Sequence, residues 1–236
     1  MPFNGRKGGG LIMKVTKRQK TWAALDTAKL YSFAEAIEAL RPYCSKKFDE
    51  SLEIAVRLSI DVTKADQNIR GMLSLPNGTG KKVRVAVFTN DKQEDAKKAG
   101  ADVVGGEDLI EKVAAGNIDF DRVIATPEMM PKMSKVARVL GPKGLMPNPK
   151  LGTVTTDVVG AVAMAKAGQI EYRAEKNGII HAGIGKMSFS TDKLVENADA
   201  LVNQLKKVKP ASAKGQYILG CSIATTQGPG LHIDVK

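Results

Sequence analysis

The sequence predicts a split α+β domain, built from both ends of the chain, with an inserted α/β domain whose Rossmann-like parallel sheet lies in three layers. Over residues 52–60, apolar and polar side chains alternate strictly, which is typical of an antiparallel strand with one face in solvent. Over residues 83–140, short apolar segments alternate with helical patterns, which indicates parallel strands joined by crossover helices. Because neither end of the chain could cover its own sheet, we expect the two ends to fold as one body.

The first part of the chain is expected to contain a basic arm, a helix and two strands. Six basic residues and no acidic residue precede Asp26, and two of the six, Lys17 and Arg18, are candidate phosphate contacts. A helix begins after Ser32, whose spacing to Glu35 is that of a capping box. The two expected strands cover residues 52–60 and 69–75.

The middle of the chain has the pattern of the α/β domain. The expected strands cover residues 83–88, 101–104 and 122–125, and the expected helices cover residues 93–99, 107–115 and 132–140. Residues 140–152 then combine three glycines with three prolines. This composition excludes a helix or a central strand and predicts a rigid loop.

The last part of the chain returns to the pattern of the split domain. Helices are expected over residues 158–167, with Gly168 as the cap, and over residues 192–207. Asn177-Gly178 predicts a hairpin between the expected strands. These strands cover residues 170–173 and 179–184, and further strands follow within residues 215–235. We therefore predict a split domain of residues 1–70 and 157–236, an inserted domain of residues 71–156, and a hinge at the two crossings.

The net charge of +11 favours a polyanionic partner. Residues 1–70 carry a net charge of +5, residues 71–159 carry +2, and residues 160–236 carry +4. The split domain is therefore the expected nucleic-acid-binding part. We find no apolar segment long enough to span a membrane and no secretory signal, so no membrane partner is expected.

No motif predicts a catalytic, cofactor or metal site. Cys44 and Cys221 are far apart and are expected to be reduced, partly buried thiols. His181 lies in an apolar segment and is expected in the core. The glycine-lysine pairs lack the remaining residues of a phosphate-binding loop, and the first strand of the α/β domain is not followed by a dinucleotide motif. A nucleotide-using enzyme built on the α/β domain is the alternative from another functional class.

Two segments are candidate RNA contacts. The first, residues 45–51, offers cations for phosphates, an aromatic ring for a ribose or base, and oxygens for a 2′-hydroxyl. Its candidate residues are Lys46, Lys47, Phe48, Glu50 and Ser51. The alternative is a solvated strand entrance with Phe48 in the core. The second segment, residues 224–230, offers Thr226, Gln227 and Gly228, and its alternative is an ordinary turn.

At these residues the chain resembles the ribosomal protein L1 family, from about Lys17 onward. The resemblance rests on the following motifs: Lys47-Phe-Asp-Glu50, Asp66-Gln-Asn-Ile-Arg-Gly71, Leu140-Gly-Pro-Lys-Gly-Leu-Met-Pro-Asn-Pro-Lys-Leu-Gly152, Gln169-Ile-Glu-Tyr-Arg173, Gly185-Lys186 with Ser188-Phe189, and Gly228-Pro229. The motif at residues 140–152 is the most specific of them.

The resemblance implies a non-enzymatic large-subunit protein, monomeric within the cytoplasmic ribosome, whose partners are large-subunit ribosomal RNA, exit-site tRNA and its own messenger RNA. It implies an RNA surface that includes Lys47, Phe48, Glu50, Ser51, Thr226, Gln227 and Gly228, to which we add Lys46, Lys186, Lys17 and Arg18. Three positions depart from the family: Ser51 stands where threonine is usual, Gln227 where methionine is usual, and Asn77 where histidine is common. A free messenger-binding regulator is a further alternative.

Overall fold

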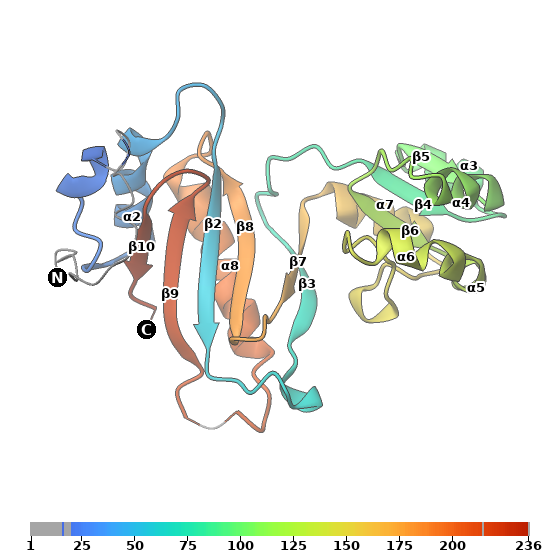
Figure 1. Cartoon of the computed structure of the whole chain (residues 1–236). Helices are drawn as coiled ribbons and strands as arrows, with labels where there is room; N and C mark the ends of the chain where they lie inside the picture. Colours follow the sequence, from blue (N-terminus) through green and yellow to red (C-terminus); the bar gives the residue numbers. More distant parts are fainter. Residues whose placement is uncertain (1–15, 17–19, 214, 236) are drawn as a thin grey trace, which may run out of the picture. The chain divides into compact units, whose positions relative to one another are not determined.

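The computed structural model describes residue 16, residues 20–213 and residues 215–235. The chain forms two compact units, which we call unit 1 (Met1–Asn68 with Ala174–Lys236) and unit 2 (Ile69–Arg173). Its elements mix helices and strands, and they include a parallel sheet of three strands, as an α/β fold requires (Figure 1). Within the described part of the chain, no helix is long and apolar enough to cross a bilayer.

Unit 1 is built on a five-stranded sheet in the order β1-β10-β9-β2-β8 (Figure 1). Its strands are β1 (Leu30–Tyr31), β2 (Ser51–Leu58), β8 (Ile179–Lys186), β9 (Ile218–Thr225) and β10 (Gly230–Ile233). All neighbours are antiparallel except β1 and β10, which are parallel. Because β2 lies between β8 and β9, the early part of the chain pairs on both sides with the late part.

Two helices, α2 (Phe33–Leu40) and α8 (Thr191–Lys207), pack against this sheet and against each other. The predicted capping box is present, since the Ser32 hydroxyl accepts from the Glu35 N–H at 3.3 Å and the Glu35 carboxylate accepts from the Ser32 N–H at 3.2 Å. The predicted alternation along β2 is also confirmed. Its buried side chains are Leu52, Ile54, Val56 and Leu58.

Unit 2 holds a parallel sheet in the order β5-β4-β6. Its strands are β4 (Val85–Phe88), β5 (Val103–Gly105) and β6 (Arg122–Ala125). One face packs with α3 (Gln93–Lys98) and α7 (Val158–Lys166), and the other with α4 (Glu107–Ala114), α5 (Met130–Met133) and α6 (Ala137–Leu140). Apolar side chains alternate between the two faces: Val85 and Val87 belong to one core, and Ala86 and Phe88 to the other. A separate antiparallel ribbon joins β3 (Arg70–Ser74) to β7 (Gln169–Arg173).

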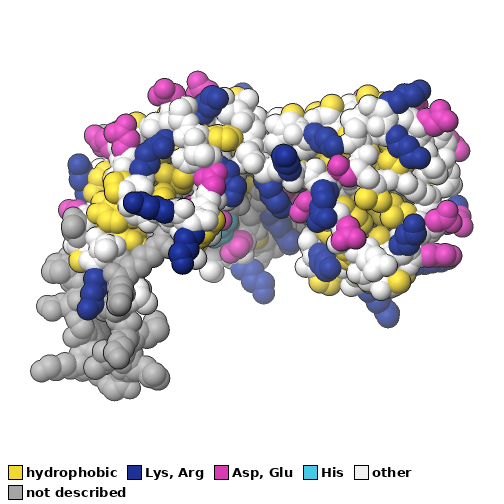
Figure 2. Space-filling view, turned by 90° about the horizontal axis from the view of Figure 1, so that it is seen from above, with side chains coloured by type: hydrophobic (Ala, Val, Ile, Leu, Met, Phe, Trp, Pro, Cys, Tyr) yellow, Lys and Arg dark blue, Asp and Glu magenta, His cyan; other side chains and the backbone are white. Residues whose placement is uncertain are grey.

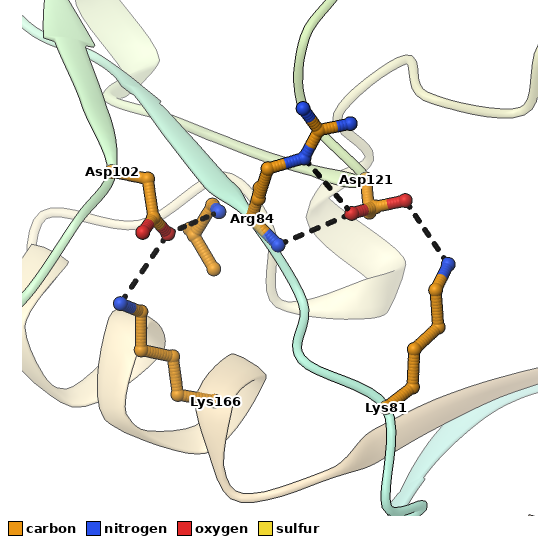
Figure 3. A network of polar contacts seen from close by, with 6 residues as sticks. Lys81, Arg84, Asp102, Asp121 and Lys166 are labelled. Carbon is orange, nitrogen blue, oxygen red and sulfur yellow. Dashed lines mark hydrogen bonds and ion pairs between the residues drawn. The ribbon is translucent and has the colours of Figure 1, made fainter.

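An acidic residue stands immediately before β5, and another before β6 (Figure 3). The Asp102 carboxylate accepts from the Val85 N–H at 2.9 Å and pairs with Lys166 at 3.3 Å. The Asp121 carboxylate accepts from the Arg84 N–H at 3.2 Å and pairs with Lys81 at 3.0 Å. The two carboxylates therefore fix the start of the central strand β4 from both sides.

The glycine- and proline-rich segment is an ordered loop of unit 2. Gly144 (φ +69°) and Gly152 (φ +65°) adopt the left-handed conformation that favours glycine. The Asn148 N–H donates to the Thr153 hydroxyl at 2.8 Å, which closes the loop on itself. Leu145 and Met146 pack against the core of unit 2. The predicted rigid loop is thus held by its own hydrogen bonds and by apolar anchors.

The second boundary of the predicted inserted domain is wrong. It was expected near residue 157, but unit 2 extends to Arg173. The helix α7 supplies Val158, Ala161 and Val162 to the core beside β4 and β6, so it forms the third layer of the α/β unit. The local sequence of a helix does not show which sheet the helix covers.

Two further local predictions are confirmed only in part. The predicted hairpin through Gly178 is short, with an antiparallel bridge between Ala174 and Ile180 and a hydrogen bond from the Glu175 N–H to the Ile179 carbonyl at 2.9 Å. The main ladders lie elsewhere, because β7 pairs with β3 and β8 pairs with β2. Gly178 (φ +70°) nevertheless makes the predicted turn. The expected helix over residues 132–140 is interrupted by the 3-10 turn Ser134–Val136 between α5 and α6. The other short 3-10 turns are Trp22–Ala24, Arg41–Tyr43, Ala65–Gln67, Pro127–Met129 and Pro149–Leu151.

Candidate nucleic-acid interface

One end of the unit-1 sheet brings together the predicted contact segments. At this end β2 begins and β8 and β9 finish (Figure 1). Ser51 is paired with Lys186, and its neighbour Leu52 is paired with Thr225. Segments that are far apart in the sequence therefore lie side by side here, as the resemblance implied.

Glu50 joins two of these segments from the inside. Its side chain is 1% exposed. One carboxylate oxygen accepts from the Ser45 N–H at 2.7 Å, and the other accepts from the Gln227 N–H at 3.4 Å. A buried carboxylate is stabilised by such charge-assisted hydrogen bonds. Glu50 was predicted to contact RNA, but its carboxylate is turned into the protein and positions the surrounding backbone.

Ser51 and Thr226 form the second link. The Ser51 N–H donates to the Thr226 hydroxyl at 2.9 Å, and the Thr226 N–H donates to the Ser51 carbonyl at 3.1 Å. The Lys186 ammonium donates to the Ser51 hydroxyl at 2.8 Å and to the Asp49 carbonyl at 3.2 Å. These bonds hold a hydroxyl-rich surface with one fixed cation.

The tip of the first segment is presented to solvent. Asp49 is held by Ser188, whose N–H and hydroxyl donate to its carboxylate at 3.1 and 2.7 Å. Between the fixed ends, Phe48 is 43% exposed, and Lys46 and Lys47 are exposed and form no ion pair with another described residue. The alternative in which Phe48 enters the core is therefore wrong.

Gly228 completes a tight turn between β9 and β10. Its N–H donates to the Thr225 carbonyl at 3.0 Å. A Cβ at this position would lie 2.1 Å from the Thr225 hydroxyl oxygen, which no side chain can accommodate without movement. Glycine at position 228 thus avoids a clash with the Thr225 side chain, and the side chain of Gln227 is exposed beside it.

The solvent-exposed face of the sheet continues from this end, and the sequence analysis did not place His181 on it. The register places Leu30, His232, Ser222, Ala55 and His181 in one row across all five strands. The side chain of His181 is 56% exposed, so the prediction that it lies in the core is wrong. Position 181 is an outward position of β8, which only the pairing with β2 reveals.

The charge is less localised than the predicted boundaries suggested. Unit 1 holds 20 basic and 13 acidic residues, and unit 2 holds 16 and 12. Six of the basic residues of unit 1 precede Asp26, and the candidates Lys17 and Arg18 among them lie outside the described residues. Figure 2 views the sheet end of unit 1 and shows Lys and Arg side chains beside exposed hydrophobic atoms. On the face that Figure 2 shows, basic side chains lie among acidic and hydrophobic ones, so this face is not uniformly basic.

No three His, Cys, Asp or Glu side chains within the described ranges are grouped to hold a metal ion. The predicted free thiols are confirmed, with Cys44 half-buried and Cys221 buried. Burial raises the pKa of Cys221 to about 12, so this thiol stays protonated at neutral pH.

Residues 40–229 match the model of the Ribosomal protein L1p/L10e family. The chain belongs to this family. Members of the ribosomal L1 family are structural RNA-binding proteins and not enzymes, and membership makes this chain a large-subunit ribosomal protein with a ribosomal, cytoplasmic location. The matched range includes every candidate contact except Lys17 and Arg18.

Proposed function

We propose that unit 1 binds large-subunit ribosomal RNA through the end of its sheet where β2 begins. The observation that carries this proposal is the exposed Lys46-Lys47-Phe48 tip between two anchored residues, Ser45 and Asp49. Such a tip offers two cations and a ring at a reduced cost of ordering the backbone, because the backbone on either side is already fixed. Membership of the ribosomal L1 family supports RNA as the polyanion.

Each exposed group has a distinct role in this proposal. Lys46 and Lys47 contact phosphates, and Lys186 contributes charge from the neighbouring strand. The ring of Phe48 packs on a ribose or base. The hydroxyls of Ser51 and Thr226 lie where they can exchange hydrogen bonds with ribose 2′-hydroxyls, and Glu50 and Gly228 act by shaping the backbone.

We further infer the finer roles that the family suggests. Unit 1 anchors the mobile stalk of the large subunit, and unit 2, joined to it by two chain crossings, assists the release of deacylated tRNA from the exit site. A messenger segment that reproduces the ribosomal RNA structure would compete for the same end of the sheet. This competition would repress translation of the protein's own operon.

Binding of the full chain to overlapping large-subunit RNA fragments from the same organism tests the proposal. Phe48→Ala should weaken binding by about 1–3 kcal/mol if the ring stacks. Leu219→Ala is the matched control, because Leu219 is similarly exposed (47%) but lies at the other end of β9. Equal RNA affinities of the two variants would show that Phe48 is not part of the interface. An RNA affinity that does not fall as the salt concentration rises would contradict the phosphate contacts.

The enzyme alternative has its own test. A nucleotide-using α/β unit would be stabilised against heat by ATP or NAD, because a ligand that binds only the folded state raises its stability. We expect no shift of the unfolding temperature with either compound. Co-sedimentation with the large subunit separates a ribosomal component from a free messenger-binding regulator.

A further inference from the structure

Unit 2 contains a small cavity beside β6, the edge strand of its parallel sheet. Its volume is about 50 Å³. The wall is formed by the edge strand β6, by α7, by the end of the glycine- and proline-rich loop and by the β3–β7 ribbon. The lining residues that matter are Arg122, Val123, Gly152, Met72, Met164 and Gln169.

Arg122 lines this cavity, and its guanidinium forms no ion pair with another described residue. Among the described residues, its guanidinium has a single hydrogen-bond acceptor, the carbonyl of Gln169 at 2.9 Å. Partial burial lowers the pKa of Arg122, since water is withdrawn from the charged group, and the attraction of Glu171 opposes this shift. Glu171, however, bonds Arg70 at 2.8 Å and forms no ion pair with Arg122. Most donors of the Arg122 fork are thus left for a ligand.

The backbone of β6 supplies a second donor at the same place. The N–H groups of Arg122 and Thr126 donate to carbonyls of the β4 segment, whereas the N–H of Ala125 donates to Thr153 on the outer side. Because successive N–H groups of a strand point to opposite sides, the N–H of Val123 points to the outer edge, which borders the cavity. A guanidinium and a backbone N–H on one wall form a typical pair of oxyanion donors.

The remaining walls are largely apolar and set the size of the ligand. Met72, Leu151, Met164 and the alanines of α7 line the cavity opposite the donors. An apolar surround strengthens the attraction between a guanidinium and an anion. The volume is enough for a few water molecules or one oxyanion group, and too small for a whole nucleotide.

We propose that this cavity binds a single oxyanion group, a phosphate or a carboxylate, through the Arg122 guanidinium and the Val123 N–H. The rest of the ligand remains outside the cavity. This site belongs to unit 2 and uses none of the residues of the proposed RNA surface of unit 1. It can therefore fail or succeed without the proposed function.

The test is a titration of the ¹⁵N-labelled full chain with inorganic phosphate, and separately with acetate, at constant ionic strength set by chloride. We expect saturable shifts of the Val123 N–H and Arg122 Nε–H resonances with one of the two anions, which identifies the group. Arg122→Met should abolish them. Arg138→Met, which removes an exposed arginine from α6 on the other face of the sheet, should leave them unchanged.

Arg122→Lys keeps the charge but loses the fork, so affinity should fall about ten- to hundredfold if two bonds to the anion are replaced by one. This variant also decides the test if Arg122→Met does not fold. Three results would overturn the proposal: no saturable shift with either anion, equal shifts with chloride alone, or shifts that persist in Arg122→Met or at full strength in Arg122→Lys.

Discussion

The Ser51 N–H donates to the Thr226 hydroxyl at 2.9 Å, across 175 positions of sequence. The same hydroxyl lies 3.3 Å from the Ser51 carbonyl, to which it can donate in turn. One side chain thereby satisfies both backbone groups of the first residue of β2. The beginning of β2 and the turn after β9 are fixed to one another by this contact, and the proposed RNA surface depends on it.

Replacement of the Thr226 hydroxyl should loosen this contact. Thr226→Val keeps the shape but removes the acceptor, and we expect a loss of about 0.5–1.5 kcal/mol in the free energy of unfolding, since the site is exposed and water replaces part of the bond. Thr226→Ser keeps the hydroxyl and should remain close to the natural protein. Urea unfolding measures both. Identical stabilities of the valine and serine variants would show that the hydrogen bond contributes nothing.

Glu50→Gln should destabilise unit 1 more than an exposed change of the same kind. The amide has one acceptor where the carboxylate has two, and its NH₂ group would face a backbone donor, so we expect a cost of about 1–3 kcal/mol. Glu53→Gln is the matched control on the exposed side of β2, with an expected change within about 0.5 kcal/mol. RNA affinity should fall with Glu50→Gln, because the Lys46–Phe48 tip loses an anchor. An RNA affinity that stays constant despite the lost stability would show that the Glu50 anchor is not needed for RNA binding.

Gly228→Ala should lower the free energy of unfolding, although composition alone suggests an ordinary turn at this position. The added methyl group would meet the Thr225 hydroxyl oxygen at 2.1 Å, and the forced adjustment should cost about 1–3 kcal/mol. Gly230→Ala, where a Cβ meets nothing within 4 Å, is the control. Thermal unfolding compares the two. Thr225→Ala should restore most of the loss, because the Thr225 hydroxyl is buried without a hydrogen-bond partner among the described residues; failure of this rescue would place the strain elsewhere.

Acid should destabilise unit 2 through the two carboxylates at the start of β4. The hydrogen bond from the Val85 N–H holds the pKa of Asp102 below its ordinary value of 3.8, and Lys81, followed by the Arg84 N–H, does the same for Asp121. A carboxylate whose pKa is lowered on folding stabilises the folded state above its unfolded pKa, and this stability is lost as the pH falls through the folded value. The loss is therefore expected below about pH 4.

The measurement is the unfolding temperature between pH 2 and pH 6, for the natural protein and for Asp102→Asn with Asp121→Asn. The double variant lacks both titrating groups, so its curve should be flatter in the acid range and should approach that of the natural protein at the lowest pH. Parallel curves over the whole range would exclude these two carboxylates as the source of the acid sensitivity.

Local chemistry made several elements predictable. The capping box at Ser32 and the alternation along β2 depend on residues within one turn or one strand, and both are found as expected. The short apolar strands of the α/β unit are also read from neighbours alone. The motif at residues 140–152 and the segments around Phe48 and Thr226 were sufficient to point to the ribosomal L1 family.

Other features depend on partners that local patterns do not contain. The local sequence that predicted the helix α7 did not indicate which sheet the helix covers, and α7 belongs to unit 2. The hairpin signal at Asn177-Gly178 predicted the turn correctly, but it did not predict that β7 pairs mainly with β3 and β8 with β2. Glu50 was expected at the surface but is buried, and His181 was expected in the core but is exposed. The reason is that the burial of these residues depends on the strands that lie beside them.

The linear order of residues was therefore enough for the class of fold, the family and the segments that carry the candidate contacts. Folding in three dimensions decided which of these side chains face solvent, which carboxylate only positions its neighbours, and that Arg122 lines a cavity. The physical reason is the sequence separation between the residues that determine each feature. Helix caps and strand alternation are set by residues a few positions apart, whereas burial, register and the balance of charges are set by contacts between segments separated by a hundred residues or more.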